Sequence, residues 1–352
     1  MYSPHDSVEI CKLMEDFKYD RTKTYEVLSK YEKKQNDTVY GINVFNEIYY
    51  NNIINPYIQS EKIIDMHVHT NASDGDLSIE KLIYLAIEKK VGVLGITDHN
   101  TVQSLKNLKN VSSLITDSNI KIINGIELST KRNIGRMHIL GYGIDIYNSV
   151  LNKKLNEIKD NSINKILSIL EILKKDYNII FSYEDIKTLI NVNHNLGRVD
   201  VARLLVKNGL VQSASEAFEK YLVSAYEKVR GINKGLTYEE CINLILSSGG
   251  IPVLAHPKTL KLNEKEFFSL LKNMINCGLM GIECYHSSFN KEEMAYYLDI
   301  ANKYNLLVSG GSDFHGSIKP DISLGTGKNN NLYIRKLSIL DKLKWIFLKC
   351  MI

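Results

Sequence analysis

Short apolar segments that each end near a potential metal ligand are the feature that most constrains the fold of this chain. Seven such segments are strand candidates: residues 63–69, 91–99, 121–129, 136–143, 250–256, 281–286 and 306–315. A helix with Ser78 as its N-cap is predicted over residues 78–90, and similar helices are predicted over 237–247, 264–276 and 291–304. Apolar strands that alternate with helices predict β/α units and a parallel sheet.

A long helical stretch interrupts this alternation. The fourth and fifth strand candidates are separated by about a hundred residues, more than a β/α connection needs. Helices are predicted within it over residues 151–175, 183–190, 199–208 and 214–222. We therefore expect a substrate-capping helical sub-domain, residues 146–235, inserted over one end of a barrel made of residues 61–145 and 236–352. The second barrel part ends in a helix over 336–348.

Residues 1–60 precede the first strand candidate and contain no metal-ligand pattern. Apolar residues at helical spacing predict a helical N-terminal extension. We expect it to cap or pack on the barrel, with dimerisation or partner binding as the alternative.

The first strand candidate and the turn after it have the clearest local pattern. Successive strand side chains point to opposite faces, so Asp65, His67 and His69 share one face, and Asp74 follows in a short polar turn. Two imidazoles on one face can bind a single metal ion. A His-x-His pair alone is nevertheless weak evidence for a metal site.

The remaining strand candidates repeat this arrangement. Further potential ligands at or near their ends are His99, Glu127, His138, His256, His286, Asp313 and His315, whereas Asp98 is expected to be a hydrogen-bond partner. In parallel β/α barrels, side chains at the carboxyl ends of several strands build the active site. Seven of the nine histidines of the chain occupy such positions. The sequence therefore predicts that these side chains converge on one site.

Composition argues against several other classes of protein. A net charge of +4 in 352 residues permits an anionic substrate, but no stable nucleic-acid complex is expected. The five cysteines form no CxxC pair, which suits a reducing compartment. No signal-peptide pattern is present, and no apolar run approaches the ~18–20 residues of a membrane span. We therefore expect a cytoplasmic protein without a membrane partner, while the sequence does not set its oligomeric state.

The ligand types indicate the metal and the chemistry. Histidine and carboxylate ligands without thiolates suit Zn²⁺, Mn²⁺ or Fe²⁺. The candidates outnumber what one ion can use, so two or three ions with Glu127 as a bridge are expected. Such a cluster produces a metal-bridging hydroxide and holds the charged oxygens of a phosphoryl group. Hydrolysis of a phosphate ester is the reaction class that this set of residues indicates.

Five motifs form a set that is highly specific. They are D-M-H-V-H-T…S-D-G (65–75), I-T-D-H-N-T (96–101), G-I-E-L-S-T with M-H-I-L-G-Y (125–142), L-A-H-P (254–257) and G-G-S-D-F-H-G (310–316). Over about residues 63–326 the chain resembles the PHP (polymerase and histidinol phosphatase) superfamily. Within it, the chain is similar to the stand-alone branch of RNase AM and nucleoside 3′,5′-bisphosphate phosphatase enzymes, through G-R-V-D-V-A-R-L-L-V (197–206), A-Y (225–226) and G-I-E-C-Y-H-S (281–287).

This resemblance implies a distorted (β/α)₇ barrel with a trinuclear metal site. One ion would be held by His67, His69, Glu127 and Asp313, a second by Glu127, His138 and His256, and a third by Asp74, His99 and His315. It also implies that Arg198 and His286 bind substrate phosphate, with His286 or a metal-bound water as the proton donor. The planar fork of arginine suits bidentate phosphate contact.

The activity implied is that of a metal-dependent phosphoesterase. It would remove the 3′-phosphate of a nucleoside 3′,5′-bisphosphate, or trim short 5′-phosphorylated RNA from its 5′ end. Histidinol-phosphate phosphatase, another small phosphomonoesterase and a non-catalytic regulatory PHP domain are the alternatives. Two departures from the superfamily pattern bear on the substrate: Asp200 stands where relatives carry a histidine after G-R-x, and residues 1–60 lie outside the common pattern.

Overall fold

The structure is a computed structural model that describes residues 62–118, 120–131, 135–191, 196–229 and 235–343 of the chain. All of them belong to one compact unit, Lys62–Leu343. The predicted N-terminal extension, residues 1–60, lies outside the described residues. Of the predicted C-terminal helix, the structure describes residues up to 343, and residues 338–343 are helical.

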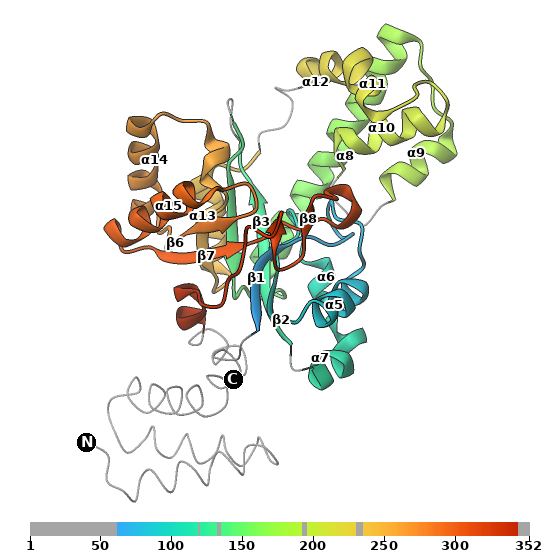
Figure 1. The fold of residues 1–352 in the computed structure, drawn as a ribbon. Coiled ribbons are helices and arrows are strands. Elements are labelled where there is room, and N and C mark those ends of the chain that lie inside the picture. The colour runs from blue at the N-terminus through green and yellow to red at the C-terminus, as the bar shows by residue number, and fades with distance from the viewer. Residues whose placement is uncertain (1–61, 119, 132–134, 192–195, 230–234, 344–352) are drawn as a thin grey trace, which may run out of the picture. The chain divides into compact units, whose positions relative to one another are not determined.

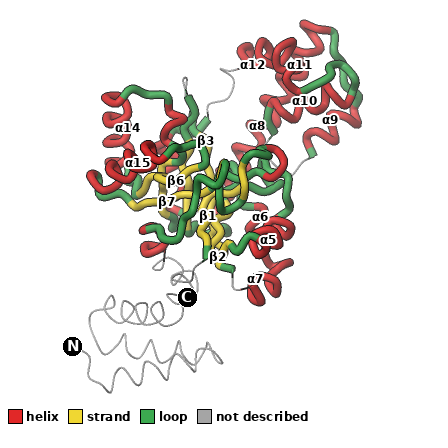
Figure 2. The backbone as a smooth tube through the Cα atoms, viewed as in Figure 1, coloured by secondary structure: helices red, strands yellow, loops and turns green. Residues whose placement is uncertain are grey.

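Seven strands form one sheet in which sequence order equals spatial order (Figure 1, Figure 2). They are β1 (Ile63–Val68), β2 (Val91–Ile96), β3 (Lys121–Ser129), β4 (His138–Tyr142), β5 (Ile251–Leu254), β6 (Gly281–His286) and β7 (Leu307–Gly311). The ends of the sheet meet where Val68 bridges Phe314 and where the Asp313 amide donates to the His67 carbonyl at 2.8 Å. The sheet is therefore a nearly closed barrel, and all seven predicted strands are confirmed.

One strand direction differs from the prediction of a parallel sheet. Strand β4 runs antiparallel to both β3 and β5, whereas the other neighbouring pairs are parallel. Only residues 130–137 connect β3 to β4, which is too short for the helical crossover that a parallel strand requires. The hairpin has a consequence for the site, because it brings the first residue of β4 to the end where the parallel strands finish.

Helices pack around the sheet. They are α5 (Ile79–Glu88), α6 (Gln103–Lys106), α7 (Ser112–Ser118), α13 (Tyr238–Ser247), α14 (Glu264–Asn276) and α15 (Lys291–Lys303), with short 3₁₀ helices η2 (Leu108–Val111), η4 (Pro257–Leu260) and η5 (Gly316–Ile318). The Ser78 hydroxyl accepts from the Lys81 amide at 3.3 Å, as the sequence predicts. Capping boxes start α13, α14 and α15. A small hairpin of β8 (Ile322–Ser323) and β9 (Gly327–Lys328) follows β7.

The segment between β4 and β5 is helical, as predicted. It contains α8 (Ser149–Tyr177), α9 (Tyr183–Ile190), α10 (Arg198–Lys207), α11 (Ala214–Ala217), the π-helix η3 (Phe218–Leu222) and α12 (Val223–Val229). The helix predicted over 214–222 therefore continues to residue 229, with one π-turn inside it. Within the described residues, no helix is both long enough and apolar enough to cross a membrane.

Two hydrophobic cores underlie these elements. One packs the barrel helices on the sheet, and the other joins α8–α12 through residues such as Leu170, Val201 and Leu205. Helix α8 contributes to both, because Leu151 and Leu155 pack in the barrel core while its later turns pack in the second core. These separate cores support an inserted sub-domain, whose boundaries at residues 146 and 235 stay a prediction.

Closure of the barrel predicts an intolerant position at Gly311. A Cβ there would lie 2.3 Å from the His67 amide nitrogen and 2.6 Å from the His67 Cβ, so the seam between β1 and β7 would have to open. We expect Gly311→Ala to lower the free energy of unfolding by roughly 1–3 kcal/mol. Gly235→Ala is the control, since its Cβ would meet Lys131 at 3.5 Å, an ordinary contact. Equal midpoints for the two variants in chemical denaturation would contradict the prediction.

Candidate metal and phosphate site

One end of the barrel gathers the histidines and carboxylates predicted from the sequence. Glu127 lies on β3, His67 on β1 and His286 at the end of β6, while His69, His99, His256, Asp313 and His315 lie just beyond the ends of their strands. His138 is the first residue of the antiparallel strand β4, and this direction places it at the same end. Asp74 joins them from the turn after β1. The structure thus brings together all nine predicted metal ligands.

Glu127 is the centre of this cluster. Its side chain is buried, and the two carboxylate oxygens face different imidazoles, with His99 Nδ1 at 3.3 Å from Oε2. The Oε1 atom lies 2.7 Å from His138 Nδ1 and 2.8 Å from His256 Nε2. The Oε2 atom lies 3.2 Å from the Nε2 atoms of both His67 and His69. A carboxylate with its two oxygens in two ligand groups is the arrangement that can bridge two metal ions.

The potential ligands form overlapping groups. His67, His69, Glu127 and Asp313 place one ligand atom each within 4.8 Å of one another, and so do His69, Asp74, His99 and His315, and also His99, Glu127 and His138. The first group coincides with the first ion site that the resemblance implies. The other two differ slightly from the implied sets, because His99 takes part in both and His256 reaches the cluster through Glu127 Oε1.

Hydrogen bonds at Nδ1 orient several of these histidines. His67 Nδ1 lies 2.9 Å from Glu283 Oε1, and His315 Nδ1 lies 2.8 Å from the Asp313 carbonyl oxygen. An ionised carboxylate and a carbonyl can only accept, so in both rings Nδ1 carries the proton and donates. Nε2 is then the atom directed at the cluster, and its lone pair would be available to a metal ion once that nitrogen is deprotonated.

His286 has the opposite arrangement. Its Nδ1 accepts from the Ser288 amide at 3.1 Å, so a neutral ring carries its proton on Nε2. That Nε2 is buried, has no hydrogen-bond partner, and lies 3.5 Å from Asp313 Oδ2. His286 is therefore arranged as a hydrogen-bond donor rather than a metal ligand. His286 also forms a possible ligand group with His67 and Glu283. Both oxygens of Glu283 already accept hydrogen bonds, one from His67 and one from the His256 amide, which agrees with a donor role for His286.

The carboxylates of the cluster are held in their ionised form by the histidines around them. Burial alone would raise the pKa of Glu127, yet His99, His138 and His67 hold that pKa well below its usual value. The same balance of burial against histidine contacts keeps the pKa of Asp313 well below its usual value. The protein thus buries ionised carboxylates among imidazoles, and both ring nitrogens of His69 are buried without a hydrogen-bond partner. This donor set fits divalent metal ions.

Two residues near the cluster, Glu283 and Lys319, are not predicted from the sequence. Glu283 orients His67, and its signal was a charged residue inside the apolar strand 281–286. A register shift between Glu283 and Tyr285 lets both Glu283 and His286 reach the cluster, which strict alternation would not predict. Lys319 forms an ion pair with Asp313, with 2.7 Å between Nζ and Oδ2, and no motif marked it. Asp98 is the hydrogen-bond partner that was predicted, since it accepts from the Thr70 amide at 2.7 Å and from the Thr70 hydroxyl at 2.8 Å.

Arg198 lies in the insert, at the first position of α10. Its guanidinium carbon is 4.0 Å from the centre of the Tyr226 ring and 5.4 Å from that of Phe218. These contacts are within the insert, and they do not bring Arg198 to the strand-end cluster. Its predicted role in phosphate binding stays a prediction.

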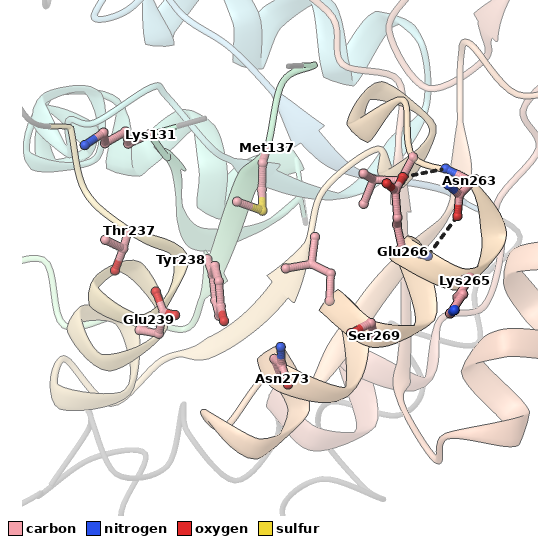
Figure 3. A pocket seen from close by; sticks show the side chains of 12 residues that line it. Lys131, Met137, Thr237, Tyr238, Glu239, Asn263, Lys265, Glu266, Ser269 and Asn273 are labelled. Carbon is pink, nitrogen blue, oxygen red and sulfur yellow. Dashed lines mark hydrogen bonds between the residues drawn. The ribbon is translucent and has the colours of Figure 1, made fainter. Parts of the chain in front are cut away.

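A separate hollow of about 880 Å³ lies beside α13 and α14 (Figure 3). Lys131, Met137, Tyr238, Asn263 and Asn273 are among the residues that line it. No histidine and none of the clustered carboxylates does so. The hollow is therefore separate from the strand-end cluster.

Comparison with known proteins agrees with the fold. A family model described as the PHP domain matches residues 65–236. A 5′-3′ exoribonuclease of Escherichia coli, Rnm, is 32% identical over 264 residues, which cover 75% of this chain and 88% of that protein. The chain belongs to the PHP-domain family.

Two further proteins are similar over most of their length. The 3′,5′-nucleoside bisphosphate phosphatase of Chromobacterium violaceum is 26% identical over 252 residues, 72% of this chain and 87% of the relative. A solved structure of a metal-dependent phosphoesterase from Bifidobacterium adolescentis superposes with a TM-score of 0.60 at 25% identity, covering 77% of this chain and 92% of that chain.

Glu283 is expected to control metal affinity through His67. Replacing it by glutamine removes the charge that holds the proton on His67 Nδ1. We expect Glu283→Gln to bind Mn²⁺ or Zn²⁺ about 10- to 100-fold more weakly, measured by competition with a chelating dye. Glu293→Gln is the matched control, because Glu293 pairs with Lys258 at the surface. Unchanged affinity in Glu283→Gln would rule out this role.

Metal affinity is also expected to rise with pH. Burial by itself would lower the pKa of His69, but Asp313 and Glu127 raise it to about 9. Without metal, His69 therefore holds a proton at neutral pH that an incoming ion must displace. Dye competition between about pH 6.5 and about pH 9 should show tighter binding as pH rises, with proton release on loading at the lower pH. Affinity that does not change with pH would count against this assignment.

Proposed function

We propose that this chain hydrolyses a phosphate ester of a nucleotide, with divalent ions held by the strand-end cluster. It is a hydrolase of the metal-dependent phosphoesterase type. The observation that carries the proposal is Glu127, a buried carboxylate whose two oxygens face separate sets of imidazoles, at 2.7–2.8 Å from Oε1 and 3.2–3.3 Å from Oε2. Such geometry suits adjacent ions that act together on one phosphoryl group.

The ligand sets proposed are those that the superfamily resemblance implies. His67, His69, Glu127 and Asp313 would hold one ion, Glu127, His138 and His256 a second, and Asp74, His99 and His315 a third. Mn²⁺, Zn²⁺ and Fe²⁺ all suit imidazole and carboxylate ligands. Ions bound there would supply Lewis-acid activation of water and neutralise phosphoryl oxygens.

Side chains outside the ligand sets would act on the substrate directly. His286 carries its Nε2 proton toward the cluster, where it would donate to a phosphoryl oxygen or to the leaving oxygen. Arg198 is proposed to bind substrate phosphate from the insert. Its guanidinium carbon lies 4.0 Å from the centre of the Tyr226 ring, and the planar fork of its N–H groups suits a bidentate contact.

The substrates proposed are a nucleoside 3′,5′-bisphosphate, which would lose its 3′-phosphate, and short 5′-phosphorylated RNA, which would be trimmed from its 5′ end. The printed functions of the relatives in Chromobacterium violaceum and Escherichia coli support these two classes. Both are small and anionic at the reacting end, as the cluster requires. Histidinol phosphate is the comparison substrate, since no contact in the structure favours it.

Phosphate release and RNA shortening test this proposal directly. Protein loaded with Mn²⁺ should release phosphate from adenosine 3′,5′-bisphosphate, or shorten a 5′-phosphorylated RNA trimer, faster than it releases phosphate from histidinol phosphate. Protein stripped of metal with a chelator should be inactive, and added metal should restore turnover. Metal-loaded protein that leaves both nucleotide substrates intact would overturn the nucleotide assignment.

Asp313→Asn should remove activity without unfolding the protein. The substitution replaces one oxygen of the carboxylate by an NH₂ group and removes its negative charge, which faces His67 and His69. We therefore expect at least about a hundredfold loss of kcat. Asp321→Asn is the matched control, because Asp321 forms an exposed pair with Lys328. Circular dichroism should be the same for both variants. Retained turnover in Asp313→Asn would contradict the proposed site.

A further inference from the structure

Two donors converge on the same oxygen of Asp313. Lys319 Nζ lies 2.7 Å and His286 Nε2 lies 3.5 Å from Oδ2. The other oxygen, Oδ1, faces the ligand histidines, 3.2 Å from His69 Nε2 and 3.6 Å from His67 Nε2. Asp313 thus separates the metal ligands on one side from an ammonium and an imidazole N–H on the other.

Both donors are of a kind that binds oxyanions, and we call Lys319 together with His286 the candidate oxyanion site. An ammonium group is a point charge that binds phosphate oxygens, whereas it cannot serve as a metal ligand while it is protonated. His286 is buried, but the Lys319 side chain is 37% exposed, so Lys319 stands where the cluster meets solvent. A substrate that enters from solvent would therefore meet Lys319 as its phosphate reaches the cluster.

The backbone that carries Lys319 is held in place by the turn that carries Asp74. Asp76 accepts hydrogen bonds from the Ser317 amide at 2.9 Å and from the Ser317 hydroxyl. The Lys319 carbonyl accepts from the Ile322 amide at 3.0 Å, and Pro320 restricts the chain between them. The lysine is thus a positioned part of the site, although it belongs to a loop.

We propose that Lys319 binds a non-bridging phosphoryl oxygen of the substrate, together with the Nε2 proton of His286. This inference rests on the proposed phosphoesterase function and extends it, because it assigns the dianionic end of a phosphomonoester to Lys319 and His286. When no substrate is bound, both donors face Asp313 Oδ2 instead. On binding, the ammonium turns from the carboxylate to the phosphate, while Asp313 Oδ1 keeps its place among the ligand histidines.

A purely supporting role is the competing explanation. Lys319 would then only orient Asp313 through their ion pair, and its loss would lower metal occupancy without changing the affinity of the loaded site for phosphate. Phosphate binding and metal content are therefore the measurements that separate the two roles.

The experiment compares Lys319→Met and Lys319→Arg with Lys328→Met. Lys328 is the matched control, since it lies in the same chain region and pairs with Asp321 at 3.5 Å with its side chain half exposed. Each protein is loaded with Mn²⁺, its metal content is measured, and inorganic phosphate is titrated into it in a calorimeter. Steady-state kinetics on adenosine 3′,5′-bisphosphate are measured on the same samples.

We expect Lys319→Met to keep its metal and to bind phosphate at least about tenfold more weakly, with a raised KM and a lowered kcat. Lys319→Arg should recover part of the phosphate affinity, because it restores the charge in a different shape. Lys328→Met should match the parent chain. Phosphate affinity unchanged in Lys319→Met would overturn the inference, and so would a loss confined to metal content.

If the proposed phosphoesterase function were wrong, the measurements would differ from those that overturn the Lys319 inference. The parent chain would then hydrolyse none of the esters. If it still bound phosphate, and Lys319→Met bound it more weakly, the candidate oxyanion site would stand while the reaction assigned to it would fall.

Discussion

The contact of one buried carboxylate with five imidazoles is the interaction on which the site depends. Glu127 lies within 3.3 Å of ring nitrogens of His67, His69, His99, His138 and His256, which come from four other strands or their ends. An ionised carboxylate buried in a barrel is costly unless charged or donating groups surround it. The strands can close around Glu127 because they bring these groups, and the same groups are suited to hold metal ions.

Local strain marks the segments that deliver the ligands. His256 and Asp313 both have positive φ, 23° and 57°, a region that side chains with a Cβ rarely adopt. The surrounding fold holds both, since the His256 amide donates to Glu283 at 2.7 Å and the Asp313 amide donates to the His67 carbonyl at 2.8 Å. Barrel closure and ligand placement therefore depend on the same contacts, because Asp313 lies at the seam between β1 and β7.

The strand positions and the convergence of the candidate ligands could be predicted from the sequence, because short apolar runs that end in histidine or a carboxylate are local patterns. The direction of β4 required knowledge of where the strands end, which alternation alone does not provide. Glu283 could not be assigned because its partner His67 is distant in sequence and a register shift follows Glu283 in β6. Lys319 could not be assigned because its contact with Asp313 depends on the conformation of the loop after β7, which no motif specifies. The proton positions on His67 and His286 depend on contacts that only the folded chain shows.

The contacts of Asp200 explain why this residue can differ from the histidine of the superfamily pattern. A carboxylate where relatives carry a histidine suggested a difference in substrate choice. In the structure Asp200 Oδ2 accepts from the Gly197 amide at 2.8 Å and so caps the start of α10, where the helix dipole favours negative charge. Its other oxygen faces Arg203 at 3.5 Å. Asp200 therefore stabilises the turn that presents Arg198, and any difference in substrate choice is better sought at Lys319, which directly borders the cluster.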